Sequence, residues 1–212
     1  DYIDLYQIHT FDPNTPLEET LRCLDDMVRS GKVRYIGASN YAAWEMMKAL
    51  GISERLGLNR YVSLQICYSL ADRTPEREIV PMCLDAGVGI IPYFPLAGGI
   101  LTGKYSGAAI PAGSRAEKDP NFKRFLTEKR LQLGREVSRI AAELGCSPGA
   151  LSIAWLMNRP AVSSVIVGVT SVAQLEDNYA AVSLELSEDV LRRLDELSAW
   201  TRYSEPFAEY RL

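Results

Sequence analysis

Residues 1–41 read DYIDLYQIHTFDPNTPLEETLRCLDDMVRSGKVRYIGASNY, and their pattern predicts two strands joined by a helix. The apolar runs Ile3–Ile8 and Val33–Ala38 have the length and composition of buried strands. A helix between two such strands is typical of parallel α/β proteins. The rest of the chain can therefore be searched for the same alternation.

The predicted helix between the two strands has recognisable signals at both ends. Thr15 is expected to be its N-cap, Pro16 its first residue and Glu18 the acid of a capping box. The helix is predicted to run to about Ser30, and Gly31 is expected to end it.

The alternation continues to the C-terminus. Further strands are predicted over Val62–Ile66, Val88–Phe94 and Val162–Val167. Further helices are predicted over Ala42–Leu50, Pro75–Ala86, Leu126–Leu144, Pro148–Asn158, Val172–Val182 and Glu188–Leu197, with Gly51 and Gly87 ending the first two and Ser147 and Ser187 capping the fourth and last. Five strands alternating with helices predict a parallel sheet.

Two architectures fit this alternation: a doubly wound sheet and a (β/α)₈ barrel. Periodicity alone does not separate them, but the GxGxxG fingerprint of the dinucleotide-binding doubly wound fold is absent from the sequence. The segment 95–126 is rich in Gly, Pro and Lys and is too long for an ordinary connection, so we expect it to be functional, for example as a lid.

Composition excludes several classes of function. The 212 residues carry a formal net charge of −4, which argues against nucleic acid as a partner. The four cysteines have no metal-ligand spacing, so no metal site is expected, and they are better explained as reduced thiols of a cytoplasmic protein. No apolar run is long enough for a membrane span, and no signal peptide is visible. Because the chain opens directly on a strand at Asp1, we expect it to be a truncated sequence.

Polar and aromatic residues follow the predicted strands, at the sheet edge where α/β proteins bind ligands. They are His9, the pair Ser39–Asn40, Gln65, Tyr93 and the run 168–171. Hydroxyl and amide groups suit a carboxamide, and a tyrosine ring offers a stacking face. The run 168–171 precedes a helix N-terminus, which attracts phosphate. Together these groups suit a nicotinamide dinucleotide.

Four motifs carry a resemblance to a known family. DLYQIH, GKVRYIGASNY, YFPLAGGILTGKY and VIVGVTSVAQLEDN follow one another in the order found in the aldo-keto reductases. The sequence resembles that family over essentially its whole length. The resemblance implies a (β/α)₈ TIM barrel, here a truncated one with about five of the eight βα units in a single domain, residues 1–212. It also implies NAD(P)H-dependent reduction of aldehydes or ketones to alcohols.

The resemblance also assigns roles to individual residues. His9 matches the catalytic histidine that orients the substrate, while the family's catalytic Asp, Tyr and Lys are expected before residue 1. The residues predicted to bind the cofactor are Ser39, Asn40, Gln65, Tyr93, Phe94, Pro95, Leu96, Gly98, Lys104, Arg115, Gly168, Val169, Thr170, Ser171, Gln174, Asp177 and Asn178, with Arg115 included because it lies in the same segment as the matching residues. Among them, Tyr93 matches the ring that stacks on nicotinamide.

The choice between NADP(H) and NAD(H) depends on the charged residues near the adenosine phosphate. Gly168 and Gln174 stand where the aldose-reductase type has Lys and Arg, and they resemble the subgroup that includes the potassium-channel β subunits. Lys104 and Arg115 offer charge for a 2′-phosphate. We therefore expect NADP(H), with NAD(H) as the alternative. No metal is needed for the implied chemistry.

Simpler interpretations stand beside these. His9 can be structural, Ser39–Asn40 a turn, Tyr93 a core residue and Lys104 a solvated charge. Near the C-terminus, the resemblance implies a place in the substrate pocket for the loop with Trp200, Tyr203 and Phe207, and a packing role fits these residues as well. At the level of function, the alternatives are a cofactor-binding regulatory subunit and an inactive fragment. A small carbonyl compound is the expected partner, with neither nucleic acid nor membrane, and the oligomeric state stays open.

Overall fold

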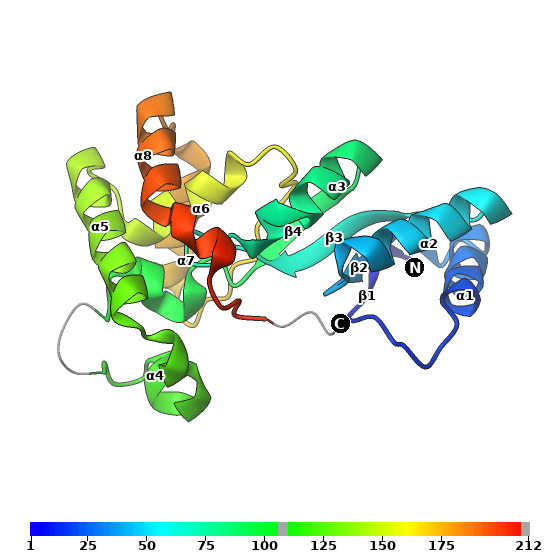
Figure 1. Cartoon of the computed structure of the whole chain (residues 1–212), viewed down its shortest axis with the longest axis horizontal. Coiled ribbons are helices and arrows are strands. Elements are labelled where there is room, and N and C mark those ends of the chain that lie inside the picture. Colours follow the sequence, from blue (N-terminus) through cyan, green and yellow to red (C-terminus); the bar gives the residue numbers. More distant parts are fainter. Residues whose placement is uncertain (106–109, 209–212) are drawn as a thin grey trace. The chain divides into compact units, whose positions relative to one another are not determined.

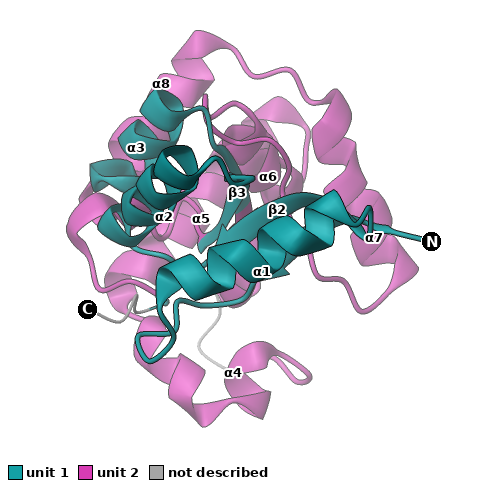
Figure 2. Ribbon diagram, turned by 90° about the vertical axis from the view of Figure 1, so that its right-hand side faces the viewer, with its two compact units in different colours: residues 1–66, 76–91, 208–212 teal, residues 67–75, 92–207 magenta. Residues whose placement is uncertain are grey.

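A computed structural model describes residues 1–105 and 110–208 (Figure 1). Within these residues the chain forms two compact units, coloured in Figure 2. Unit 1 comprises residues 1–66, 76–91 and 208, and unit 2 comprises residues 67–75 and 92–207.

Four strands form one sheet in the order β1 (Ile3–Ile8), β2 (Val33–Ser39), β3 (Tyr61–Cys67) and β4 (Gly89–Tyr93). The β1–β2 and β2–β3 pairs are parallel, as the alternation of strands and helices predicts. Parallel strands end at the same edge of a sheet, so the residues that follow them are brought together there.

The helices of unit 1 pack on this sheet through apolar side chains. They are α1 (Leu17–Arg29), α2 (Ala43–Leu56) and α3 (Ile79–Ala86), with the 3₁₀ turn η1 (Thr74–Arg77) before α3. Leu21 of α1 and Met46 of α2 are fully buried. Gly87 ends α3 with a left-handed φ of 63°, as predicted.

Two predicted ends of unit 1 helices are wrong. Thr15 does not cap α1, because its hydroxyl donates instead to the carboxylate of Asp12 (2.7 Å) and Pro16 holds the cap position. Helix α2 passes through Gly51 and ends at Gly57, whose φ is 63°. A glycine inside a helix costs only about 1 kcal/mol relative to alanine, which the packing of α2 overrides.

Unit 2 is predominantly helical. Its elements are η2 (Ala97–Thr102), α4 (Arg115–Lys118), η3 (Pro120–Phe125), α5 (Glu128–Leu144), α6 (Pro148–Met157), α7 (Val172–Tyr179), η4 (Ala180–Ser183), α8 (Glu188–Ser198) and η5 (Ala199–Tyr203). The predicted caps of α6 and α8 are confirmed, since Ser147 and Ser187 each accept a backbone N–H from the residue three positions on. Most of α6 is buried, which makes it the central helix of this unit.

The predicted fifth strand is not formed. Residues 163–169 have no regular secondary structure, and the N–H of Ile166 donates to the carbonyl of Pro92 (2.9 Å). An apolar run has the right composition for a strand, but a strand also needs a ladder of partners. The described residues therefore show four of the expected strands.

The segment 95–126 is more ordered than the expected loop. It contains η2, α4 and η3, while residues 106–109 lie outside the described part. Phe122 and Phe125 of η3 are buried, so apolar packing orders this segment.

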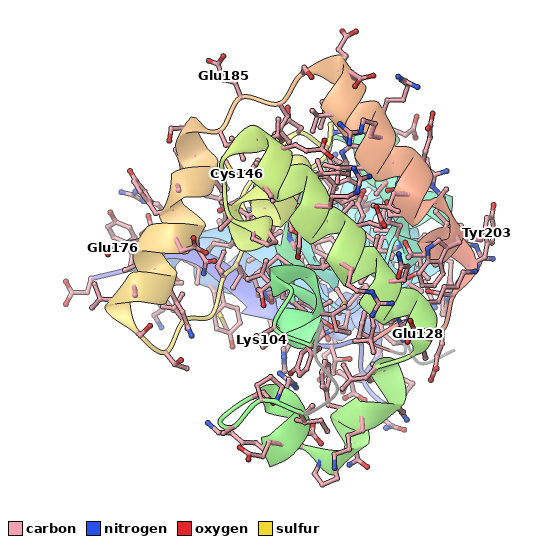
Figure 3. All side chains as sticks on the ribbon, turned by 90° about the vertical axis from the view of Figure 1, so that its left-hand side faces the viewer. Lys104, Glu128, Cys146, Glu176, Glu185 and Tyr203 are labelled. Atoms are coloured by element: carbon pink, nitrogen blue, oxygen red, sulfur yellow. The ribbon has the colours of Figure 1, made fainter. Side chains whose placement is uncertain are left out.

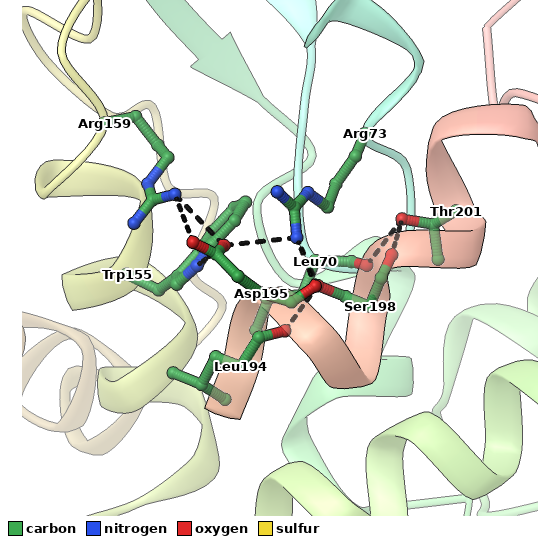
Figure 4. Close-up of polar contacts among 8 residues, drawn as sticks. All are labelled: Leu70, Arg73, Trp155, Arg159, Leu194, Asp195, Ser198 and Thr201. Carbon is green, nitrogen blue, oxygen red and sulfur yellow. Dashed lines mark hydrogen bonds and ion pairs between the residues drawn. The ribbon is translucent and has the colours of Figure 1, made fainter. Parts of the chain in front are cut away.

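A partly buried ionic cluster joins three segments of unit 2 (Figure 4). Asp195 of α8 pairs with Arg73 (3.1 Å) and Arg159 (3.0 Å) and accepts a hydrogen bond from the indole of Trp155 (3.0 Å). The Arg73 side chain is only 1% exposed, and it also donates to the hydroxyl of Ser198 (2.8 Å). The cluster ties the segment that follows β3 to α6 and α8.

Over residues 1–105 and 110–208, no single helix has the length and apolar character needed to cross a membrane. Only α5 and α6 taken together meet that criterion, and they are bent by 92°.

Candidate functional site

Four predicted site residues meet where the first three strands of unit 1 end. Ser39 and Gln65 are register partners, and the N–H of Asn40 donates to the carbonyl of Gln65 (3.0 Å). The Asn40 amide donates to the carbonyl of His9 (3.0 Å) and to the hydroxyl of Ser39 (3.1 Å). His9 is exposed and Ser39 is buried. The carboxyl edge of the sheet thus brings the hydroxyl and amide groups of Ser39, Asn40 and Gln65 together with the backbone of His9, as the strand pattern predicts.

The backbone is strained at this edge. Asn40 has a φ of 56°, and in the described chain the other non-glycine residues with positive φ are Phe94 and Ala97. A left-handed φ costs about 1–2 kcal/mol at Phe94 and Ala97 and less at Asn40, whose short amide side chain tolerates it, and strain of this kind concentrates at functional sites. Asn40 and Phe94 are predicted cofactor-binding residues, and Ala97 lies between two more of them, Leu96 and Gly98.

Asn40 is expected to stabilise the strand edge through both its left-handed backbone and its side-chain amide. Asn40→Gly keeps the left-handed φ but removes the amide bonds to His9 and Ser39, so the midpoint of thermal unfolding should fall modestly. Asn40→Ala adds the backbone strain, at about 1 kcal/mol beyond the glycine variant. Differential scanning fluorimetry of both variants tests this order, and an alanine variant as stable as the glycine variant would contradict it.

A second polar layer, which the sequence did not indicate, lies two residues earlier on the same strands. Gln7, Gly37 and Ser63 are in register across the sheet. The Oε1 atom of Gln7 and the Oγ atom of Ser63 are buried and have no hydrogen-bond partner among the described residues. A Cβ at Gly37 would lie 2.3 Å from Ser63 Oγ, so any larger residue at this position would require the Ser63 hydroxyl to move. Ser39 and Gln65 lie two residues after Gly37 and Ser63, and residues two apart on a strand point to the same face of the sheet. Both layers therefore lie on one face.

The segment after β4 in unit 2 carries the next group of predicted residues. Burial raises the pKa of the Tyr93 phenol, which therefore stays neutral. Pro95 is buried and Leu96 half-buried, and the Leu96 carbonyl accepts the N–H of Gly99 (2.8 Å). Positive φ recurs at Phe94, Ala97, Gly98, Gly99 and Gly103, so the backbone turns back on itself repeatedly.

Two glycines of this segment have positive φ and lie close to neighbouring side chains. A Cβ at Gly98 would lie 2.4 Å from Phe122 Cζ, and a Cβ at Gly99 would lie 2.3 Å from Lys104 Cε. The Lys104 side chain, labelled in Figure 3, therefore folds over the backbone of η2. The N–H groups of Ala97, Gly99 and Leu101 already donate to backbone carbonyls, so the Lys104 ammonium is the group of this segment that suits a phosphate.

Arg115 is the first residue of α4 and lies beside the same segment. Its guanidinium stands over the ring of Phe94 (5.0 Å) and the ring of Phe122 (5.7 Å). The guanidinium is exposed, and within the described ranges it rests on rings instead of a carboxylate. The preceding Ser114 has a buried hydroxyl without a partner among the described residues. A cation held in this way keeps its hydrogen-bond donors for a ligand.

The remaining predicted residues surround the start of α7. Thr170 donates through its N–H (2.9 Å) and its hydroxyl (3.1 Å) to the Gln174 side chain, while Ser171 caps the helix. Residues 168–177, including Gly168, Val169 and Asp177, are exposed, whereas Asn178 is half-buried. A Cβ on Gly149 would lie 3.4 Å from an Asp177 oxygen, so this carboxylate lies near the first turn of α6.

No group of three or more His, Cys, Asp or Glu side chains in the described chain is placed to hold a metal ion. The groups that are present are amide, hydroxyl, ammonium and guanidinium donors, together with aromatic faces. In unit 1 these donors suit a carboxamide, and in unit 2 they suit phosphate. The parallel strand pairs and the alternating helices make the chain an α/β protein, consistent with part of a (β/α)₈ barrel.

The chain belongs to the aldo/keto reductase family, whose sequence profile matches residues 1–199. The uncharacterized oxidoreductase YrpG of Bacillus subtilis is 38% identical over 93% of the chain and 59% of its own length. The putative aryl-alcohol dehydrogenase C977.14c of Schizosaccharomyces pombe is 36% identical over 92% of the chain and 55% of its own length. The versiconal hemiacetal acetate reductase of Aspergillus parasiticus is 35% identical over 92% of the chain and 57% of its own length. The chain thus spans somewhat more than half the length of these relatives.

Proposed function

We propose that the protein is an NADP(H)-dependent reductase that converts aldehydes or ketones to alcohols, with NAD(H) as the alternative cofactor. The observation that carries the proposal is the strained segment 94–103, over which Lys104 folds and beside which Arg115 offers its guanidinium. Two cations at a looped backbone suit the phosphates of a dinucleotide. Membership of the family supports oxidoreductase chemistry in general.

Taken by themselves, the strand-end groups of unit 1 have the chemistry of a carboxamide site, as the family resemblance implies. Ser39, Asn40 and Gln65 offer the hydroxyl and amide groups that a carboxamide needs, and they already form one hydrogen-bonded set. The bound cofactor supplies the hydride. His9, at the same strand edge, is proposed to orient the carbonyl substrate. The Asp, Tyr and Lys implied by the family resemblance are assigned to no residue of this chain.

The substrate class and location are also proposals. Relatives named as an aryl-alcohol dehydrogenase and a hemiacetal acetate reductase support a small carbonyl compound as the substrate. The four cysteines are free thiols in the structure, which supports the proposed cytoplasmic location. The expectation that neither nucleic acid nor a membrane is a partner stays a prediction.

Removal of the Arg115 guanidinium should weaken binding of NADPH. We expect Arg115→Ala to raise the dissociation constant of NADPH about 10-fold in the full-length protein, since a charge-assisted contact to phosphate contributes about 1.5 kcal/mol or more. The dissociation constant of NADH should change less if Arg115 binds the 2′-phosphate. Titration of nicotinamide fluorescence measures both constants.

Arg192→Ala is the matched control, because Arg192 is an exposed arginine of unit 2 whose ion pairs in the described chain are with neighbours on α8. It should leave the dissociation constant unchanged. Wild-type protein that binds neither NADPH nor NADH would refute the proposed function. Binding without turnover of simple aldehydes would instead favour the regulatory-subunit alternative.

A further inference from the structure

Phe207, near the C-terminus, makes four separate contacts within unit 2. Its N–H donates to the carboxylate of Asp72 (2.8 Å), and the guanidinium of Arg130 stands over its ring at 4.3 Å. Its ring also meets those of Phe125 (4.6 Å) and Phe94 (5.2 Å). A residue so close to the chain end is thus fixed through both its backbone and its side chain.

The two charged groups that hold Phe207 are themselves buried. Asp72 is 1% exposed and Arg130 is 2% exposed. Arg130 also donates to the backbone carbonyl of Glu205, two residues before Phe207. The carboxylate of Asp72 is fixed by the N–H and hydroxyl of Thr74. Segment 205–207 is therefore anchored to groups that cannot reorient without losing their own partners.

The partner of Phe207 with the greatest consequence is Phe94. Its φ of 62° is unfavourable for a non-glycine residue, and a backbone of this kind persists only where the surrounding contacts hold it. Phe207 and Phe122 meet this ring at 5.2 and 6.2 Å, and Arg115 rests on it at 5.0 Å. The contacts form a continuous chain from Phe207 through Phe94 to Arg115.

We propose that Phe207 is a positioning residue for nucleotide binding, because it holds the Phe94 ring that supports the Arg115 guanidinium. The inference rests on the proposed function. Phe207 does not contact the ligand in this scheme. It limits the orientations of Arg115 before the ligand arrives, which lowers the entropic cost of forming the phosphate contact. Segment 205–207 then has a role in cofactor affinity beyond packing.

A double-mutant cycle between Phe207 and Arg115 tests the coupling in the full-length protein. The dissociation constant of NADPH is measured by fluorescence titration for wild type, Phe207→Ala, Arg115→Ala and the double variant. Phe207→Ala should raise the constant about 5-fold in the wild-type background, which is part of the effect of about 10-fold expected when the Arg115 guanidinium itself is removed, and leave it unchanged in the Arg115→Ala background. Phe207→Leu, which retains apolar volume but not the ring, should give a smaller increase. Tyr203→Ala removes an aromatic ring that is 78% exposed on η5 and serves as the control.

The outcomes separate the two claims. An equal increase in both backgrounds, or no increase in either, overturns the positioning role while leaving the proposed function intact. Wild-type protein that does not bind NADPH overturns both. If circular dichroism shows that Phe207→Ala does not fold, the cycle is repeated with Phe207→Leu and Arg115→Ala. If the two residues are coupled, Phe207→Leu raises the dissociation constant of NADPH only when Arg115 is present.

Discussion

Asp195→Ala should lower the free energy of unfolding by about 3 kcal/mol, the scale expected when one partner of a buried ion pair is removed. Asp195 pairs with two arginines, Arg73 and Arg159, and accepts the indole N–H of Trp155. The Arg73 side chain is 1% exposed, so its charge would lose a carboxylate in a place that water does not easily reach. The Asp195 side chain is itself 32% exposed, which keeps the expected loss at the lower end of the range for buried pairs.

Asp189→Ala on the same helix provides the matched control. Asp189 pairs with Arg192, and both side chains are more than 60% exposed. Solvent screens such a pair, so its loss should change stability by less than about 1 kcal/mol. Equilibrium urea unfolding of both variants gives the comparison. Equal losses at the two positions would show that the cluster of Figure 4 contributes no more than a surface pair.

Gly134→Ala should destabilise the protein by about 2 kcal/mol, although alanine is the better helix former. A Cβ at Gly134 would lie 2.4 Å from the backbone carbonyl oxygen of Ile100. Helix α5 packs on η2 at this point, and a backbone oxygen cannot rotate away as a side chain would. Either α5 or η2 must move, and η2 contains the segment proposed to bind phosphate.

Gly51→Ala in the middle of α2 gives the opposite expectation. Nothing lies within 4 Å of a Cβ at Gly51, so the gain in helix propensity should appear as about 1 kcal/mol of added stability. Thermal unfolding of the two variants therefore should shift in opposite directions. A Gly134→Ala variant as stable as wild type would mean that α5 and η2 separate at little cost. NADPH titration of that variant would then show whether the phosphate segment has moved with η2.

Local sequence determined much of the fold. The apolar runs of β1 to β4 and the caps Ser147, Ser187 and Gly87 lie where the pattern predicts, because strand composition and cap geometry depend on neighbours within a few residues. The strand-edge set of His9, Ser39, Asn40 and Gln65 was also predictable. Parallel strands end at one edge, so positions at the ends of neighbouring strands must meet.

The tertiary structure decided the features that depend on distant partners. The run 162–167 has the composition of a strand, but a ladder needs a neighbouring backbone, and no local pattern reveals whether one is present. Helix α2 continues past Gly51 because packing outweighs a propensity of about 1 kcal/mol. The left-handed backbone of Phe94 and the contacts of Phe207 and Asp195 join residues far apart in the chain. A strained backbone or a buried charge persists only where contacts with distant residues hold it in place. Such features can therefore be recognised from the tertiary structure but not from the local sequence.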